Sequence, residues 1–162
     1  VKLFRALTDL PFAVDANQAW RNLDVAVEIA AYLKGEGCEF IEQPFPVKSI
    51  DVLESFHQVS SLPVFVDESC QRLNDVELLY NKCSGVNIKL MKCGGVTEAL
   101  RMIEKARSLQ MKILIGCMSE SSVGCRAGEW LAPLCDYADL DGRHLITNDF
   151  EESKIVSSQP LL

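Results

Sequence analysis

The stretch from Val86 to Gly95, Val-Asn-Ile-Lys-Leu-Met-Lys-Cys-Gly-Gly, decides how the rest of the chain is interpreted. The apolar residues at positions 86, 88 and 90 predict a strand over 86–91, because side chains alternate between the two faces of a strand. Lys89 falls on the other face. Burying a lysine is costly unless it meets water, an opposite charge or a substrate. Lys89 is therefore either an edge-strand residue that faces solvent or a functional residue.

On both sides of this stretch, apolar runs alternate with segments of helical periodicity. The predicted strands are Phe12–Asn17, Cys38–Gln43, Pro63–Ser69, Lys112–Met118 and Ala138–Asp141. The predicted helices are 22–34, 49–60, 73–80, 97–109 and 122–134, with Asn22 and Thr97 as side-chain caps of their helices. Almost all of the strands are continuously apolar. This indicates that both of their faces are buried, as in a parallel sheet covered by helices.

Polar side chains mark the end of each predicted strand. They recur at intervals of 22 to 28 residues, at Asp15, Glu42, Asp67, Lys89, Cys117 and Asp139. Because no glycine-rich phosphate motif follows a strand, a nucleotide-binding doubly wound sheet is disfavoured. A (β/α)8 barrel of the TIM type fits better, and a complete barrel needs about 200 residues or more. The prediction for residues 1–162 is therefore an α/β fold, a partial barrel of about six βα units.

Composition and charge argue against several classes of protein. The chain is 48% hydrophobic and 24% charged, with a net charge of −7 and no block of like charges, so nucleic acid and anionic membranes are not expected partners. No apolar run has the length of a membrane span, and the N-terminus lacks a signal-peptide pattern. Seven cysteines without a Cys-x-x-Cys pair favour free thiols in the cytoplasm over a disulfide framework or a zinc site.

Asp15, Glu42 and Asp67 are carboxylates at three successive predicted strand ends. Three anions brought together raise one another's pKa, and a divalent cation removes that cost. All-oxygen ligands suit Mg²⁺, which keeps positions for water or substrate oxygens. The alternative is that each carboxylate only caps the helix after its strand. For the set of three, a metal site is the favoured interpretation.

The next predicted strand contributes Lys89 to the same candidate site. A partly desolvated lysine beside a divalent cation can lose its proton near neutral pH. A neutral amine next to a metal-bound carboxylate can act as a general base towards the carbon alpha to that carboxylate. The cation would stabilise the negative charge that forms.

Four motifs together resemble the enolase superfamily, in its muconate-lactonising-enzyme subgroup, over nearly the whole chain. They are Val14–Trp20, Ile41–Pro44, Val66–Ser69 and Asn87–Gly95. The resemblance implies Mg²⁺ ligation by Asp15, Glu42 and Asp67, with Asn17 and Glu68 as neighbouring polar groups. It also implies the lysine-and-Mg²⁺ chemistry known for that superfamily.

The same resemblance assigns the residues around Lys89. Lys89 would be the acid/base at the end of the sixth strand of a complete barrel. Lys92 lies beyond the predicted strand, and a solvated loop lysine is the favoured interpretation for it. Gly94 and Gly95 would form the tight turn there.

The last predicted strand points to a class of substrate. Asp139 and Asp141 are two residues apart, so both side chains would lie on one face of a strand, where two carboxylates suit an ammonium group. A simple Asp-Gly turn is the alternative for Asp141. The Asp-Leu-Asp-Gly sequence also resembles the Asp-x-Asp motif of dipeptide epimerases, including those for L-Ala-D/L-Glu. The segment after the preceding strand would line the pocket with Cys117, Met118 and Ser119.

One half of the family's machinery is not found in this sequence. These enzymes carry a Lys-x-Lys base on an earlier barrel strand and a capping domain at the amino end, and both are expected to lie outside residues 1–162. Two further hypotheses therefore stay open. One is another activity of the superfamily: o-succinylbenzoate synthase, N-acylamino acid racemase or cycloisomerase. The other is an inactive fragment that folds only by association, since its open sheet edges could pair with another chain. The expected partner is a small molecule, with a homo-oligomer possible.

Overall fold

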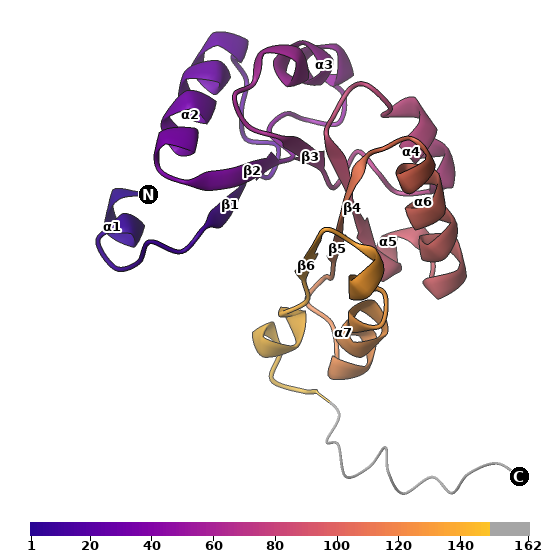
Figure 1. Ribbon diagram of the computed structural model, residues 1–162. Helices are drawn as coiled ribbons and strands as arrows, with labels where there is room; N and C mark the ends of the chain where they lie inside the picture. Colours follow the sequence, from indigo (N-terminus) through magenta and orange to yellow (C-terminus); the bar gives the residue numbers. More distant parts are fainter. Residues whose placement is uncertain (150–162) are drawn as a thin grey trace, which may run out of the picture.

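Parallel strands form a single curled sheet in the computed structural model, which describes residues 1–149. Within that part the sheet has six strands, and each pairs with its neighbour in the sequence. They are β1 (Phe12–Asp15), β2 (Cys38–Glu42), β3 (Val64–Val66), β4 (Gly85–Lys89), β5 (Lys112–Gly116) and β6 (Tyr137–Asp139). Figure 1 shows the strands along the inside of an arc, with β1 and β6 on the two sides of its opening. The predicted partial barrel is confirmed.

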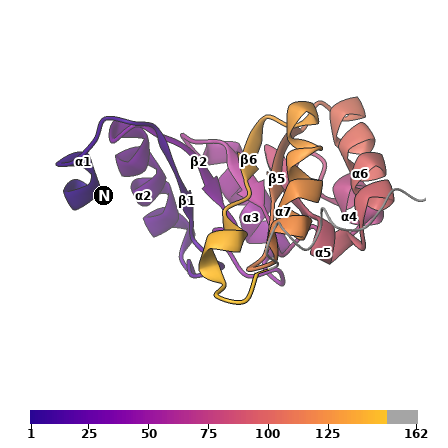
Figure 2. The same cartoon turned by 90° about the horizontal axis from the view of Figure 1, so that it is seen from below.

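Helices α2 (Leu23–Gly35), α3 (Ile50–Val59), α4 (Leu73–Leu78), α6 (Val96–Ser108) and α7 (Ser122–Glu129) cover the outside of this arc. The other described helical segments are α1 (Lys2–Arg5), α5 (Leu90–Cys93) and the 3-10 turns η1 (Ala132–Leu134) and η2 (Gly142–Leu145). In the view of Figure 2, α1 and α2 lie at one end of the molecule and α4 and α6 at the other. No helix within residues 1–149 has the length and apolarity needed to cross a membrane.

Two apolar layers pack against the two faces of the sheet. The outer layer lies between strands and helices and includes Val64, Val66, Val86 and Ile88. The inner layer is smaller and consists of Phe40, Phe65 and Leu114 with Tyr137 packed against them. Phe65 lies between Val64 and Val66 in the sequence, so β3 contributes to both layers by simple alternation.

Aromatic rings fill the base of the inner layer. The ring centroids of Phe40 and Phe65 are 4.5 Å apart, and those of Phe40 and Tyr137 are 4.8 Å apart. Gly85 of β4 makes room for this layer, because a Cβ atom there would lie 2.5 Å from Phe65 Cε1. Aromatic side chains therefore pack against the concave face of the sheet, below its carboxyl edge.

Most elements lie close to where they are expected, but several boundaries differ; the predicted strands Phe12–Asn17, Pro63–Ser69 and Ala138–Asp141, for example, end at Asp15, Val66 and Asp139. The strand predicted over 86–91 ends at Lys89, because the chain turns into α5 at Leu90. Thr97 is not a cap: α6 begins one residue before it, and its N-cap is Gly95, whose φ of 126° a side chain would strain. The helix predicted over 122–134 ends at Glu129, and a separate 3-10 turn that contains Pro133 follows. The Asn22 cap is confirmed, since its Oδ1 accepts a hydrogen bond of 3.0 Å from the Val25 amide.

Candidate active site

The predicted strand-end residues lie along one edge of the sheet. Each is the last residue of its strand or follows the strand directly: Asp15 in β1, Glu42 in β2, Asp67 after β3, Lys89 in β4, Cys117 after β5 and Asp139 in β6. Parallel pairing in sequence order places all of these carboxyl ends on the same side. This is the face on which barrels and open parallel sheets bind ligands.

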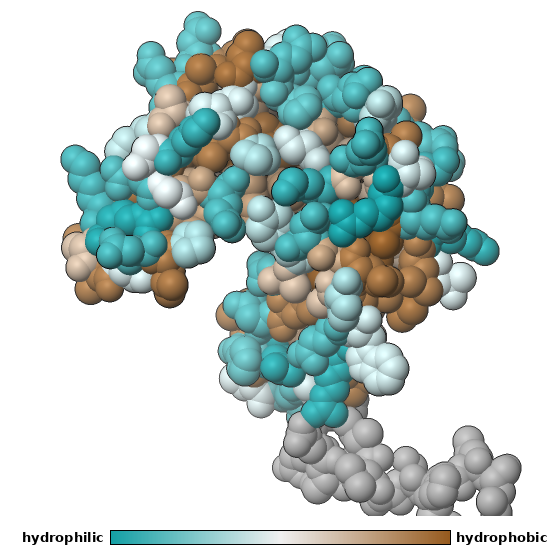
Figure 3. Space-filling model, in the orientation of Figure 1, coloured by the Kyte–Doolittle hydropathy of each residue, from teal (hydrophilic) through white to brown (hydrophobic). Residues whose placement is uncertain are grey.

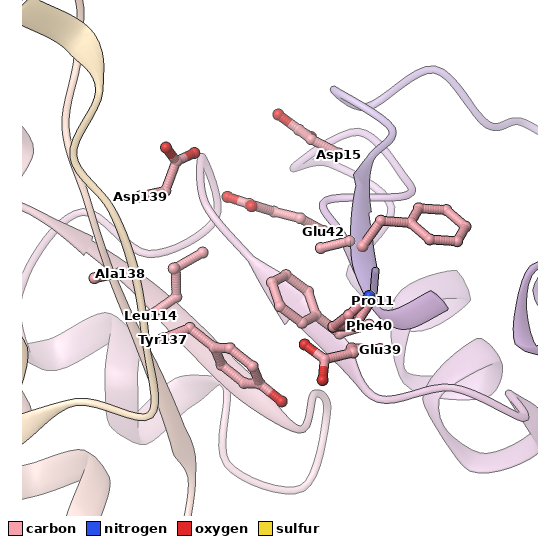
Figure 4. Close-up of a pocket in the computed structure, with 11 residues that line it drawn as sticks. Pro11, Asp15, Glu39, Phe40, Glu42, Leu114, Tyr137, Ala138 and Asp139 are labelled. Atoms are coloured by element: carbon pink, nitrogen blue, oxygen red, sulfur yellow. The ribbon is translucent and has the colours of Figure 1, made fainter. Parts of the chain in front are cut away.

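A cavity of about 320 Å³ lies between β1 and β2 on one side and β5 and β6 on the other. Figure 3 shows the molecule hollowed in this region, between α1 and β1 on one side and the segment around β6 on the other. In Figure 4 the carboxyl groups of Asp15, Glu42 and Asp139 point into one space, above the rings of Phe40 and Tyr137. The cavity thus has an acidic rim above a layer of aromatic side chains, with Glu39 lining it on the side away from the rim.

Two lysines share the carboxylate of Asp67. Lys89 Nζ lies 2.7 Å from Asp67 Oδ2, and Lys92 Nζ lies 2.5 Å from Asp67 Oδ1. The Lys92 ammonium also donates to the main-chain oxygens of Asp67, at 2.6 Å, and Asn87, at 2.9 Å. The side chain of Lys92 is only 11% exposed. The prediction that Lys92 is a solvated loop lysine is therefore wrong, because the turn into α5 directs it back under the strand ends.

Glu42 is buried beside other acids. Asn87 Nδ2 donates a hydrogen bond of 2.6 Å to its Oε1. The pKa of Glu42 is raised to about 7, mainly by burial and also by the charges of Asp15 and Asp67, although the Asn87 hydrogen bond and the charge of Lys89 act in the opposite direction. Asn87 itself is buried, and its Oδ1 accepts no hydrogen bond within residues 1–149. The negative charges of Glu42, Asp15 and Asp67 at this edge are therefore not fully offset by the described cations and hydrogen-bond donors around them.

Asp15 and its predicted neighbours form a second set of contacts. Asn17 donates to both oxygens of Asp15, from its amide N at 2.8 Å and from Nδ2 at 2.7 Å. Burial raises the pKa of Asp15, and the nearby charges of Glu68 and Asp67 add to the rise. Glu68 accepts a hydrogen bond of 2.8 Å from Gln18 Nε2, which ties the segment after β3 to the segment after β1.

Lys89 is protonated in this arrangement. Burial alone would lower its pKa, but the hydrogen bond and ion pair with Asp67, together with the charges of Glu42 and Asp15, raise the pKa above its usual value. The fall in pKa expected from the sequence depends on a cation that competes for these carboxylates. Lys89 does not face open solvent, since its side chain is 15% exposed and bonded to Asp67.

The donor set fits a divalent cation, although its side chains are directed elsewhere. Within residues 1–149, no three acidic, histidine or cysteine side chains stand close enough to hold a metal ion as they are arranged. Each carboxylate instead takes a donor from this chain: Asp15 from Asn17, Glu42 from Asn87, and Asp67 from the two lysines. The raised pKa of Glu42 and the all-oxygen donors are the features that a hard cation such as Mg²⁺ would satisfy.

The residues predicted for substrate binding lie at the β5 and β6 ends. Asp139 is the last residue of β6, but Asp141 lies beyond the strand and precedes the turn η2. The prediction that strand alternation places both side chains on one face is therefore wrong. They are nevertheless close: burial raises the pKa of Asp139, and the charge of Asp141 and a side-chain hydrogen bond with it raise it further. The charge of Lys89 opposes that rise.

The segment after β5 borders the same edge. Cys117 is half-buried, and its Sγ accepts a hydrogen bond of 3.3 Å from the Gly142 amide, which joins the segment to the residues after β6. Met118 and Ser119 are exposed. Their predicted role in lining the pocket stays a prediction, because the lining of the cavity described above does not include them.

Sequence reasoning missed three residues that organise this edge: Lys92, Asn87 and Gln43. Gln43 is fully buried and has a φ of 37°; its Oε1 accepts hydrogen bonds from the amides of Asp67, at 2.9 Å, and Ser69, at 3.1 Å. Asn87 lies on the same face of β4 as Lys89, which was a usable signal. Nothing local indicated that Gln43 would turn inward.

A sequence model of the family described as enolase C-terminal domain-like matches residues 1–140. The L-Ala-D/L-Glu epimerase of Bacteroides thetaiotaomicron is 44% identical over 160 residues, which are 98% of this chain and 42% of that protein. The chain therefore spans less than half the length of this relative.

Solved structures give the same result. An L-Ala-D/L-Glu epimerase aligns with a TM-score of 0.80 and 36% identity, over 86% of this chain and 43% of that one. A dipeptide epimerase from Enterococcus faecalis V583, complexed with Mg and the dipeptide L-Leu-L-Tyr, aligns with a TM-score of 0.79 and 33% identity, over 85% and 40% of the two chains. The resemblance predicted from the four motifs is confirmed.

Proposed function

Because this chain belongs to the enolase C-terminal domain-like family, we propose that it contributes the metal-binding carboxylates and one catalytic lysine of a Mg²⁺-dependent dipeptide epimerase. The observation that carries the proposal is the strand-end edge, where Asp15, Glu42 and Asp139 face one cavity and Lys89 lies within range of their charges. The chain's relatives include proteins named for epimerisation of L-Ala-D/L-Glu.

Asp15, Glu42 and Asp67 would hold the Mg²⁺ ion. When bound, the ion would draw electron density from the substrate carboxylate and so acidify the C–H bond alpha to it. The support from this chain is that three adjacent strands supply the three carboxylates, and that burial beside Asp15 and Asp67 already penalises the charge of Glu42.

Lys89 would transfer the proton on one face of the substrate. As the neutral amine it accepts the alpha proton, and as the ammonium it returns a proton to the same carbon. Inversion requires a second group on the opposite face, and we propose that this group and the remaining barrel strands come from residues outside this chain. Residues 1–149 would then form the carboxyl-terminal part of the barrel.

Asp139 and Asp141 would bind the ammonium group of a dipeptide. The mutual repulsion that raises the pKa of Asp139 would be relieved by a cation between the two carboxylates. An N-acyl amino acid or a succinylbenzoate precursor has no such cation, so the acidic pair favours dipeptides over the other activities of the superfamily. All seven cysteines are free, which supports a reducing compartment such as the cytoplasm.

The test is an exchange assay on the full-length protein. Dipeptides and N-acetyl amino acids are incubated in D₂O with Mg²⁺, and loss of the alpha-proton signal and formation of the epimer are followed by NMR. We expect dipeptides to exchange and epimerise and N-acetyl amino acids to react poorly. Exchange of both substrates at equal rates would refute the dipeptide assignment. No exchange of any of these substrates would refute the proposed epimerase activity.

The acidic pair has its own test. Asp139→Asn and Asp141→Asn should lower kcat/KM for dipeptides mainly through KM, because the variants lose attraction for the ammonium group. Activity towards any N-acetyl substrate should not fall. If kcat/KM for dipeptides is unchanged in both variants, the substrate assignment is wrong.

A further inference from the structure

Lys92 differs from Lys89 in the number and kind of its acceptors. Its ammonium has three N–H donors and meets three oxygens: Asp67 Oδ1, Asp67 O and Asn87 O. No donor remains for a substrate. Two of the three acceptors are main-chain oxygens, one directly after β3 and one in the middle of β4, so Lys92 joins these two strands independently of the Asp67 carboxylate.

Lys89 is held by a single side-chain contact in the part of the chain that the structure describes. Its Nζ donates to Asp67 Oδ2 at 2.7 Å, and no main-chain oxygen is bonded to it there. The two carboxylate oxygens of Asp67 therefore bind different lysines. Oδ1 binds Lys92, which has two further acceptors, and Oδ2 binds Lys89, which has no other hydrogen-bond acceptor among the described residues. While this contact lasts, the ammonium of Lys89 is directed at Asp67 and not at a substrate.

The segment that carries Lys92 is fixed from the side of α4. The guanidinium of Arg72 donates to the main-chain oxygen of Cys93, the last residue of α5. Gly94 has a φ of 93°, and a Cβ atom there would lie 2.9 Å from Arg72 Nη1, so the turn leaves room for the guanidinium. The position of Lys92 is therefore set by packing around α5 and not by its ion pair alone.

Asp67 is fixed from the opposite side by Gln43. The Oε1 atom of the buried Gln43 accepts hydrogen bonds from the amides of Asp67 and Ser69, and its Nε2 donates one of 2.9 Å to Ser69 Oγ. The main chain of Asp67 is thereby held on two sides, by Gln43 at its amide and by Lys92 at its carbonyl. Of the polar atoms of Asp67, Oδ2 is the one whose partner can change without moving the strand ends.

We propose that Lys92 is a positioning residue that locks Asp67 through Oδ1, and that Oδ2 exchanges between Lys89 and a divalent cation, so that cation binding releases Lys89 for proton transfer. The inference rests on the proposed function, because it takes Asp67 as one of the cation's ligands. It assigns Lys92 no contact with substrate.

Simple electrostatics and the positioning role predict different results. Removing either lysine removes one positive charge beside Asp67, and Coulomb repulsion alone would then let a cation bind more tightly in both variants. If Lys92 orients Asp67, however, its loss should weaken binding despite the favourable change in charge. If Lys89 competes for Oδ2, its loss should tighten binding.

The experiment is a calorimetric titration of Mg²⁺ into the full-length protein without substrate. We expect Lys92→Met to weaken Mg²⁺ binding by about tenfold or more, as for the loss of a group that orients a metal ligand. Lys89→Met should tighten it by about fivefold. The matched control is Lys105→Met, which removes an equal charge from a surface ion pair with Glu77 and should leave the affinity within about twofold.

Folding is controlled by the thermal unfolding midpoint of each variant in EDTA. If Lys92→Met does not fold, Lys92→Arg supplies the comparison, since its charge is conserved and any weakening then reports orientation alone. Tighter or unchanged Mg²⁺ binding in the Lys92 variants, with normal binding by the wild type, would overturn this inference and leave the proposed function intact. Absence of Mg²⁺ binding by the wild type would overturn both.

Discussion

The outer and inner faces of the curled sheet differ in what they bury. The outer face is apolar along its whole length and packs against helices, and residues such as Val86 and Ile88 are fully buried there. The inner face is apolar only at its base, around Phe40 and Phe65, and carries charged groups at the carboxyl edge. Stability comes mainly from the outer face, and this allows the inner edge to hold buried acids that a fold would otherwise avoid.

Neighbouring residues in one strand make this division testable. Lys89→Met should lower kcat of the full-length enzyme by about 10²–10⁴-fold, the usual contribution of a general acid/base. The unfolding midpoint in urea should change little, because Lys92 still pairs with Asp67. If the variant keeps its activity, another residue is the acid/base, and the functional role assigned to the inner edge is contradicted.

Ile88→Ala should show the opposite pattern, with the loss appearing in stability. The side chain is fully buried in the outer layer, so its truncation should lower the free energy of unfolding by about 2–5 kcal/mol, measured in urea. The Mg²⁺ affinity of the folded variant should stay near that of the wild type. Val59→Ala is the matched control: Val59 is 57% exposed on α3, and its loss should cost about 0.5 kcal/mol or less. Equal losses at the two sites would contradict the assignment of the outer core.

Gly116 is the last residue of β5 and lies at the acidic carboxyl edge of the sheet. A Cβ atom there would lie 2.5 Å from Asn87 Oδ1, so Gly116→Ala should push Asn87 away from Glu42 and cost about 1–3 kcal/mol of unfolding free energy. It should also weaken Mg²⁺ binding. In Gly35→Ala the added Cβ meets nothing within 4 Å, so this control should be stabilising by about 0.4–1 kcal/mol. If the losses of unfolding free energy in Gly116→Ala and Asn87→Ala are not additive in the double variant, the contact between the added Cβ atom and Asn87 is the cause. Strict additivity would point to another cause.

The smallest effect is expected far from the inner edge. Asn22→Ala removes the hydrogen bond to the Val25 amide at the start of α2 and should cost about 1 kcal/mol in the urea unfolding curve. Activity and Mg²⁺ affinity should not change. A change in either would mean that the outer helices communicate with the site, which would weaken the separation between the two faces.

Much of the fold could be predicted because strand and helix patterns are local. The strands of the structure begin and end close to the expected positions, and their continuous apolar character correctly indicated parallel pairing. The errors fall where the chain departs from regular geometry. The sequence predicts a solvated loop lysine at Lys92 because it lies beyond the predicted strand, whereas the turn into α5 buries it. The sequence also places Asp141 on a strand that in fact ends at Asp139.

The amino-acid sequence by itself determined the six-unit pitch, the strand-end carboxylates, Lys89 and the family, because these depend on residue type and spacing alone. Only the tertiary structure decided which groups meet. It showed that Asp67 is divided between Lys89 and Lys92, that Asn87 crosses to Glu42, and that Gln43 holds the main chain of Asp67. These contacts join residues 22 to 45 positions apart, and such pairings arise from the curvature of the sheet, which no local pattern encodes.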